Sequence, residues 1–265
     1  NLEVQNYIFS GNSCPAGHFF YICTSVRPHQ MAQRPGDSAY SPDNQIGFLR
    51  QFITPARYKR FEEVLHNRTR HITVVLEDIY QPHNASAVLR TCDCFGIQDV
   101  HIIENRNRYQ VNPDVALGSY KWLTLNRYNQ AENNTRTCLE SLKRQGYRLV
   151  ATTPHRDDHT PETLPLDRPA ALIFGTELEG LTPAVLGMAD DYLRIPMYGF
   201  TESLNISVSA AILLRGLVHR LHQTDAGWRL SEPEKEDILL SWLKASVKES
   251  EQLLEKFVQE GTNPG

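Results

Sequence analysis

Residues 193–214 of this 265-residue chain read LRIPMYGFTESLNISVSAAILL. The stretch opens within a short apolar segment, 192–195, of the kind that forms buried β-strands. Pro196 ends that strand because proline has no backbone N–H to donate to a neighbouring strand. A loop containing Gly199 follows. A long apolar helix then begins among three polar residues, Ser203, Asn205 and Ser207.

Polar side chains at a helix start have two explanations. The first backbone N–H groups of a helix are unpaired and form the positive end of its dipole, so Ser and Asn side chains commonly cap them. A strand end, a glycine loop and a polar helix start also make a ligand site in many α/β proteins. From these residues alone, a capped core helix and a ligand site are both open.

Strand-like and helix-like segments alternate through the middle of the chain. This alternation predicts a mostly parallel sheet flanked by helices on both faces. We therefore predict an α/β fold with one main domain at residues 71–224. The expected strands are 72–76, 100–103, 122–125, 148–152, 171–174 and 193–195, and the expected helices are 84–96, 130–145 and 183–188.

Three segments flank this domain. Residues 1–44 carry Gly, Pro, Ser and Asn without a sustained period, so we expect a loosely ordered segment, with a natural start near the first methionine, Met31. Residues 45–70 predict a basic helix in which Thr54 caps a turn. Residues 231–260 predict one amphipathic helix, opened by a Ser–Glu capping box, that packs on the domain or across a dimer.

Charge is distributed unevenly along the chain. The net charge of −4 argues against a uniformly basic nucleic-acid binder, yet residues 50–70 hold six Lys and Arg against two Glu. A charged helix face is commonly just solvated, but arginine also suits phosphate, so RNA docking is the other interpretation. No apolar run reaches the roughly 20 residues that a membrane span needs. Five cysteines without framework spacing indicate reduced thiols and a cytoplasmic protein.

Two further polar clusters follow predicted strands, at the sheet edge where parallel α/β proteins place ligands. The first, residues 81–91, contains Asn84, interpreted as a helix cap, and Arg90. Arg90 is unusual there because its neighbours look buried, and the structural alternative to a functional role is a helix arginine paired with an acid such as Glu177. The second, residues 175–182, lacks the paired glycines of a dinucleotide-binding turn and the lysine of a P-loop. No group of residues has zinc-ligand spacing, so we expect no metal.

Together the three clusters form an ordered triple motif: N-x5-R at 84–90, F-G-x-E-x-x-G at 174–180 and I-P-M-x(6)-L-N-x-S-x-(S/A)-A at 195–210. This triple resembles the SpoU–TrmH group of the SPOUT superfamily, which are RNA ribose 2′-O-methyltransferases that use S-adenosylmethionine. The resemblance covers about residues 45–224. Within the group, P-H-N at 82–84 and G-S-Y-K-W at 118–122 are similar to TrmH proteins, which methylate the D-loop guanosine at tRNA position 18.

The resemblance implies a site as well as an activity. It implies a homodimer with its active site near the interface, and an α/β trefoil knot whose threaded backbone forms the S-adenosylmethionine pocket. The implied catalytic residues are Arg90, Asn84, Glu177, Ser203 and Asn205. The implied cofactor contacts are Thr152, Gly175, Ile195, Met197 and Leu204. Charge and location, rather than motif, nominate five contacts to RNA phosphates: Lys59, Arg60, Arg68, Lys121 and Arg220.

Three questions stay open at this point. The same chemistry could act on ribosomal RNA or on another tRNA nucleoside. A non-catalytic RNA-binding protein could share the fold, although the presence of Arg90, Glu177 and Asn205 argues against it. Arg90 itself is either the base or a charged clamp, and the reluctance of guanidinium to give up its proton favours the clamp.

Overall fold

The computed structural model describes residues 41–110 and 112–262. The predicted loose segment and the start near Met31 fall almost wholly on residues 1–40, outside the described residues. The last three residues assigned to that segment, 42–44, instead begin a helix. Within the described ranges, no helix is both long and apolar enough to cross a membrane.

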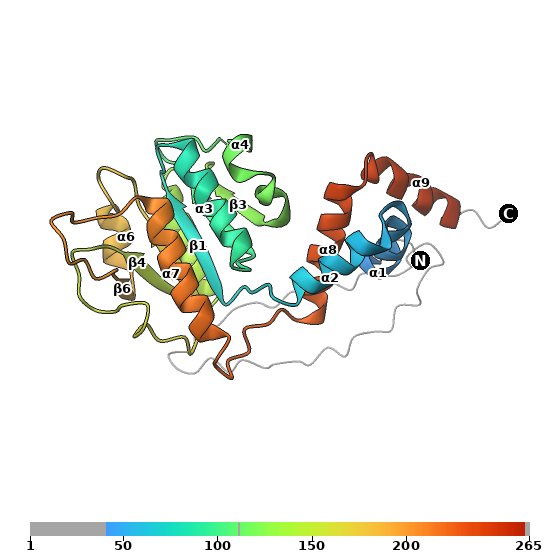
Figure 1. Ribbon diagram of the computed structural model, residues 1–265. Helices are drawn as coiled ribbons and strands as arrows, with labels where there is room; N and C mark the ends of the chain where they lie inside the picture. Colours follow the sequence, from blue (N-terminus) through green and yellow to red (C-terminus); the bar gives the residue numbers. More distant parts are fainter. Residues whose placement is uncertain (1–40, 111, 263–265) are drawn as a thin grey trace, which may run out of the picture.

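Six strands form a single sheet at the centre of the molecule, in the order β3-β2-β1-β5-β4-β6 (Figure 1). Every neighbouring pair runs parallel. The prediction of an α/β fold with a parallel sheet is therefore confirmed. The strands are β1 (Ile72–Glu77), β2 (Asp99–Ile103), β3 (Thr124–Tyr128), β4 (Arg148–Thr152), β5 (Ala170–Phe174) and β6 (Asp191–Leu193).

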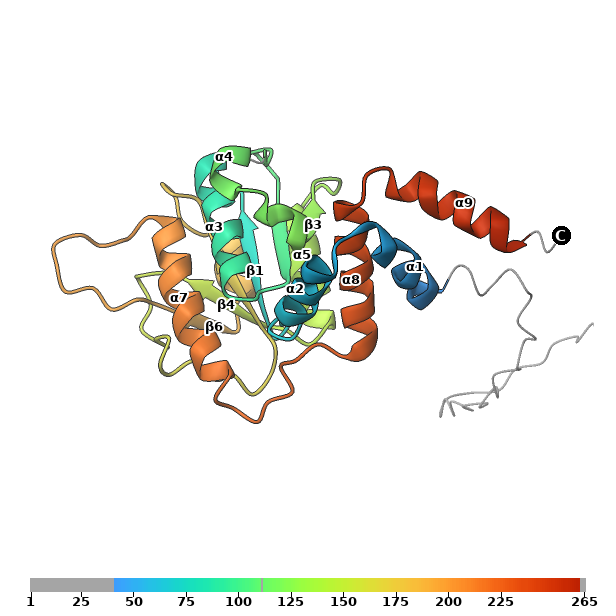
Figure 2. The ribbon, with the colours of Figure 1, turned by 45° about the vertical axis from the view of Figure 1, so that its right-hand side comes forward.

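Helices cover both faces of the sheet because the strands are apolar on both sides. In β1, Val74 and Leu76 face one hydrophobic core and Val75 faces another. Figures 1 and 2 show α3 (Pro82–Cys94) and α7 (Ile206–Leu221) side by side over the first core. The second core lies under α5 (Asn134–Arg144) and α6 (Pro183–Met188). Two short pieces, α4 (Pro113–Ala116) and the 3-10 turn η2 (Ser119–Trp122), complete the connection to β3.

Several predicted boundaries differ from the structure. The predicted strand at 122–125 runs from 124 to 128, and the last strand ends at Leu193, two residues earlier than predicted. Asn84 does not cap α3: that helix starts at Pro82 after Gln81, because proline fits a first turn that needs no N–H donor. Asn205 does cap α7, since its side chain accepts the backbone N–H of Ser207 at 2.9 Å.

Each predicted flanking helix is in fact two helices. The N-terminal pair is α1 (Pro42–Leu49), extended by the 3-10 turn η1 (Arg50–Phe52), and α2 (Pro55–Leu65). Thr54 accepts the N–H of Arg57 at 3.2 Å and so starts α2 as a separate helix. The C-terminal pair is α8 (Glu232–Ser246), opened by the predicted capping box, and α9 (Ser250–Thr262). Glu249 lies between the two helices, and its φ of 57° is incompatible with a continuous α-helix there.

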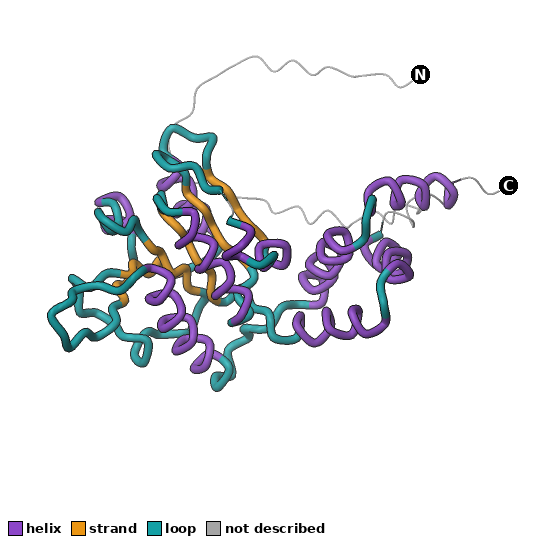
Figure 3. Tube along the Cα trace, turned by 45° about the horizontal axis from the view of Figure 1, so that its top comes forward, coloured by secondary structure: helices purple, strands orange, loops and turns teal. Residues whose placement is uncertain are grey.

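These four helices lie beside the sheet (Figure 3) and form a third hydrophobic cluster, separate from the two cores on the faces of the sheet. Phe48 of α1 stacks on Phe257 of α9 with ring centroids 4.4 Å apart. Trp242 of α8 fixes the cluster to the sheet domain, since its ring N–H donates to the carbonyl of Trp122 at 3.1 Å. The predicted amphipathic stripe of the C-terminal segment thus packs within the chain.

Candidate functional site

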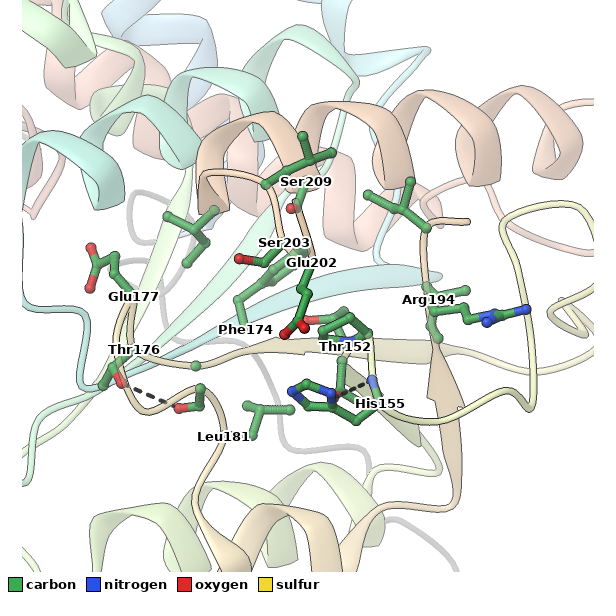
Figure 4. Close-up of a pocket in the computed structure, with 18 of the residues that line it drawn as sticks. Thr152, His155, Phe174, Thr176, Glu177, Leu181, Arg194, Glu202, Ser203 and Ser209 are labelled. Atoms are coloured by element: carbon green, nitrogen blue, oxygen red, sulfur yellow. Dashed lines mark hydrogen bonds between the residues drawn. The ribbon is translucent and has the colours of Figure 1, made fainter. Parts of the chain in front are cut away.

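A cavity of about 510 Å³ opens at the carboxyl ends of β4, β5 and β6 (Figure 4). Its walls include Thr152, Phe174 and Leu193, which are the last residues of those three strands. The loop that leads into α7 closes another side. Open parallel sheets place ligands at this edge, and pockets for small molecules span about 300–1,000 Å³. Location and size therefore both suit a small ligand.

All five residues predicted as cofactor contacts line this cavity: Thr152, Gly175, Ile195, Met197 and Leu204. They come from three segments that are separated in sequence and meet at the sheet edge. The Thr152 hydroxyl donates to the carbonyl of Ile173 at 2.7 Å, which ties the end of β4 to β5. The cavity is therefore built largely from backbone at strand ends, with apolar side chains between.

Gly175 is required by the closeness of two backbone segments. A Cβ atom at this position would lie 2.2 Å from the carbonyl oxygen of Gly180. Thr176 and Gly180 exchange backbone hydrogen bonds of 2.9 and 3.1 Å, which close the loop tightly against the strand end. Gly180 itself has φ +69°, a conformation that other residues rarely adopt. The two glycines of the F-G-x-E-x-x-G motif thus shape one wall of the cavity.

A chain of hydrogen bonds joins the three motifs. Asn84 donates its side-chain N–H to Glu177 at 2.7 Å, and Asn205 donates to the Asn84 side-chain oxygen at 3.1 Å. Glu177 also accepts the backbone N–H of Tyr80 at 3.3 Å. Asn84 is buried, so its two bonds are shielded from water and fix the start of α3 against both loops. Three widely separated motifs are therefore one polar constellation.

Arg90 stands apart from that constellation. It is exposed on α3, it is absent from the cavity wall, and within the described residues it has no ion pair. The alternative in which Arg90 is paired with Glu177 is therefore wrong. Ser203, in contrast, lies on the cavity wall together with Glu177 and Asn205. Four of the five predicted catalytic residues lie at the cavity or one hydrogen bond away.

The electrostatics of the cavity favour a cation. Three carboxylates line it, and two are occupied: Glu177 by Asn84, and Glu179 by an exposed arginine at 3.0 Å. Glu202 points into the space in Figure 4 and has no partner among the described residues. The basic wall residue Arg194 is already paired with Asp157 at 2.7 Å. In the described part of the chain, no cluster of His, Cys, Asp or Glu could hold a metal ion.

Sequence reasoning missed several wall residues, including His155, Arg194 and Glu202. The usable signal was position: His155 follows the end of β4 and Arg194 follows the end of β6, just as Gly175 follows β5. Glu202 carried no signal because a polar loop residue is ordinarily solvated. Only the folded structure, which brings the strand ends together, shows that Glu202 lines the cavity.

Two of the five predicted phosphate contacts are structural. Arg68 is 1% exposed, is paired with Asp93 and donates to the carbonyl of Ile97 at 2.9 Å, so RNA cannot reach it. Arg220 is half-buried and donates to the carbonyls of Pro161 and Leu164 at 2.6 and 2.9 Å. Both predictions are corrected on these grounds. The remaining three, Lys59, Arg60 and Lys121, are exposed on α2 and η2.

Comparison with known proteins gives concordant results. Residues 71–215 match the model of the SpoU rRNA Methylase family. A tRNA (guanosine(18)-2′-O)-methyltransferase from Borreliella burgdorferi is 45% identical over 204 residues, which cover 77% of this chain and 92% of the relative. A protein of the same name from Aquifex aeolicus is 30% identical over 202 residues, covering 75% of this chain and 94% of the relative.

A solved structure supports the same assignment. The crystal structure of the A. aeolicus TrmH/SpoU tRNA modifying enzyme superposes with a TM-score of 0.64 at 30% sequence identity. The match covers 73% of this chain and 98% of that chain, so it extends beyond the sheet domain. The family match itself spans more than half of the chain and contains all three motifs of the cavity. This chain belongs to the SpoU rRNA methylase family.

Proposed function

We propose that this protein is a tRNA ribose 2′-O-methyltransferase that uses S-adenosylmethionine and modifies guanosine 18 of the D-loop. The names of the B. burgdorferi and A. aeolicus relatives support the substrate and the position. The observation that carries the proposal is the hydrogen-bonded chain Glu177–Asn84–Asn205, which gathers three motifs at one cavity. A capped core helix would need none of these bonds.

The cavity fits the cofactor by its chemistry. Apolar walls such as Phe174 and Leu204 suit the adenine ring. The loop at Gly175 packs closely against Gly180 and shapes the same wall. The carboxylate of Glu202, which has no partner among the described residues, suits a cationic group. When bound, S-adenosylmethionine supplies an electrophilic methyl group on a sulfonium that leaves readily. The work left for the protein is alignment of the ribose and removal of one proton.

Arg90 acts in this proposal as a charged clamp. A guanidinium stays protonated in proteins, so it is a poor base, but it binds phosphate with two parallel hydrogen bonds. Exposed on α3 without an acidic partner in the described residues, its side chain is available to an RNA phosphate. There it would orient the 2′-hydroxyl and stabilise the charge that develops on the attacking oxygen. Ser203 and Asn205 would support the RNA and the loop.

Arg90 variants test this role. Arg90→Ala should lower turnover at least about a hundredfold if the guanidinium stabilises the developing charge. Arg90→Lys keeps the charge but loses the planar fork, so it should remain well below the wild-type rate. Near-wild-type turnover of Arg90→Lys would contradict the two-bond clamp, and near-wild-type turnover of Arg90→Ala would contradict any catalytic role.

We propose that the protein works as a homodimer with the active site near the interface. Large apolar side chains are exposed on the loop before α7 and on the first turns of that helix: Tyr198 at 97%, Phe200, Val208 and Ile212. Exposed apolar patches of this kind commonly mark protein contacts. A second copy is the occupant we propose, because Phe200 and Tyr198 continue directly from the cavity wall at Met197. Sedimentation equilibrium tests it.

Three other features are also proposals. We propose a catalytic unit at 71–224, with 45–70 as an RNA-docking segment and 231–260 as a C-terminal amphipathic appendage; the separate hydrophobic cluster of the flanking helices supports this division. We also propose a trefoil knot within the catalytic unit, which the family match supports. A cytoplasmic location accords with the free thiols of Cys92, Cys94 and Cys138.

The decisive experiment is transfer of labelled methyl groups from S-adenosylmethionine to unmodified tRNA and, in parallel, to ribosomal RNA, followed by nucleoside mapping. Ribose methylation at guanosine 18 of tRNA is the expected result. A 2′-O-methyl group on ribosomal RNA, or at another tRNA position, would replace the proposed substrate but keep the chemistry. RNA binding without measurable S-adenosylmethionine binding by calorimetry would favour a non-catalytic RNA-binding protein.

A further inference from the structure

The loop after β2, residues 104–110, lies beside the cavity and carries two exposed arginines, Arg106 and Arg108. The motifs assign no role to this loop. Arg106 forms an ion pair at 3.0 Å with Glu179, which belongs to the glycine loop of the cavity wall. The two loops therefore touch at the mouth of the site.

Asp78 holds this loop in one conformation. It follows β1 directly, has φ 50° and is buried at 4% exposure. One carboxylate oxygen accepts the backbone N–H groups of Asn105 and Arg106 at 2.7 and 2.8 Å, and also that of Asn107 at 3.3 Å. A buried carboxylate that accepts three successive backbone donors fixes the loop far more firmly than a solvated turn would be fixed.

Glu104 fixes the start of the same loop. Its buried carboxylate accepts two bonds from Arg127, at 2.7 and 3.0 Å, and the backbone N–H of Tyr109 at 2.7 Å. Burial alone would raise the pKa of Glu104, but the hydrogen bonds and charge of Arg127 and the Tyr109 N–H lower it overall. Asp78 and Glu104, both buried, thus hold a surface loop of seven residues in one conformation.

The loop also leads towards Arg90. Beyond it, the backbone N–H of Asn112 donates to the hydroxyl of Ser86 on α3 at 2.9 Å. Ser86 lies four residues before Arg90 and so on the same face of that helix. Arg106, Arg108 and Arg90 are all exposed. Of these three, only Arg106 has an acidic partner in the described residues.

We propose that residues 104–110 form a pre-ordered phosphate-binding loop for the substrate RNA, in which Arg106 and Arg108 contact backbone phosphates beside the target nucleotide. A phosphate replaces Glu179 on Arg106 when RNA binds. The inference rests on the proposed function, because the ligand is the RNA that is methylated. Ordering the loop in advance reduces the entropy lost on binding, and the guanidinium fork matches phosphate geometry.

The test measures the affinity of unmodified tRNA, without cofactor, across a series of salt concentrations. Arg106→Ala and Arg108→Ala should each lower the slope of log affinity against log salt by about 0.7 to 0.9, which is the release of one phosphate's counterions. At about 0.1 M salt this corresponds to roughly fivefold to eightfold weaker binding per arginine. Arg136→Ala is the matched control, because this exposed arginine on α5 pairs only with its helix neighbour Glu140.

Glu179→Gln separates phosphate binding from a merely structural ion pair. If Arg106 binds an RNA phosphate, removing the competing carboxylate of Glu179 should tighten RNA binding by up to about fivefold, which is the range of an exposed ion pair. If the pair only stiffens the loop, Glu179→Gln and Arg106→Ala should weaken binding together. The double variant completes the cycle, since the gain from Glu179→Gln should vanish when Arg106 is alanine.

The outcomes distinguish this inference from the proposed function. Wild-type slopes in both arginine variants would overturn the phosphate-binding loop, even if the enzyme methylates tRNA. Absence of methyl transfer to any RNA by the wild-type protein would overturn the proposed function instead. S-adenosylmethionine affinity, measured by calorimetry, should be unchanged in Arg108→Ala, whose side chain lies outside the cavity wall.

Discussion

Gly175 offers a sharp test of the cavity, because the structure gives the size of the perturbation. In Gly175→Ala the new Cβ would lie 2.2 Å from the carbonyl oxygen of Gly180, whereas ordinary contact begins at 3.4 Å. The two backbone segments must separate by the difference, about 1.2 Å. Neither neighbour is a flexible side-chain end, and the bonds between Thr176 and Gly180 resist the movement. The cavity wall itself must therefore shift.

The expected effects follow from that displacement. Overpacking of this kind costs about 1–3 kcal/mol in the free energy of unfolding. A displacement of about 1 Å at a reacting centre costs roughly a hundredfold in rate, so methyl transfer should fall by that order. Urea unfolding and a methyl-transfer assay on tRNA would measure these two quantities, and calorimetry would measure the affinity for S-adenosylmethionine, which should fall as the cavity wall shifts.

Gly187→Ala is the matched control. Gly187 lies in α6, and a Cβ there would meet nothing within 4 Å. Alanine favours helix over glycine, so this variant should gain about 0.5–1 kcal/mol and keep the wild-type cofactor affinity. If Gly175→Ala matched Gly187→Ala in stability and in cofactor binding, the geometric argument for the cavity wall would be refuted.

Three other predictions follow from the same region and its core. Asn84→Ala removes the bonds to Glu177 and from Asn205, so turnover should fall about tenfold or more, with about 1–2 kcal/mol lost in urea unfolding; full activity would contradict the constellation. Glu202→Gln should weaken binding of S-adenosylmethionine by about twofold to fivefold and leave binding of the product S-adenosylhomocysteine, which lacks the sulfonium charge, unaffected in calorimetry, whereas equal losses would contradict an interaction of Glu202 with the sulfonium. Burial lowers the pKa of His101 from 6.5 to about 4. The unfolded chain therefore takes up this proton first, and stability should fall as pH falls through that window, by about 2 kcal/mol at about pH 5. His101→Asn should flatten that dependence in urea titrations, and an unchanged slope would count against it.

Local chemistry explains which parts of the fold could be predicted from the sequence. The central strands have uninterrupted apolar runs, and the caps at Thr54, Asn205 and Ser231 depend on contacts within three residues. The breaks within the two flanking segments were harder to predict, because helical periodicity continues across them. At Glu249 the backbone turns at φ 57° although no glycine or proline marks the place.

Burial of charge could not be predicted from the sequence. Arg68 and the exposed arginines of α2 stand in the same basic run, so composition treats them alike. Their fates differ because Arg68 meets Asp93 and the carbonyl of Ile97, whose positions depend on how α3 packs. Arg220 likewise finds two carbonyls of the loop before β5. Charge density therefore could not separate exposed side chains such as Lys59 and Arg60 from Arg68 and Arg220, which bond to groups of the protein itself.

The geometry of α3 explains why Glu177 binds Asn84 rather than Arg90. Six residues of helix advance about 9 Å along the axis, so a loop that meets the first turn cannot also reach the second. Asn84 lies at that first turn, beside the loop end at Tyr80 that Glu177 also holds. The spacing N-x5-R thus separates two tasks along one helix. Asn84 locks the cavity loops together, and Arg90 projects beyond them, where a polyanion can approach it.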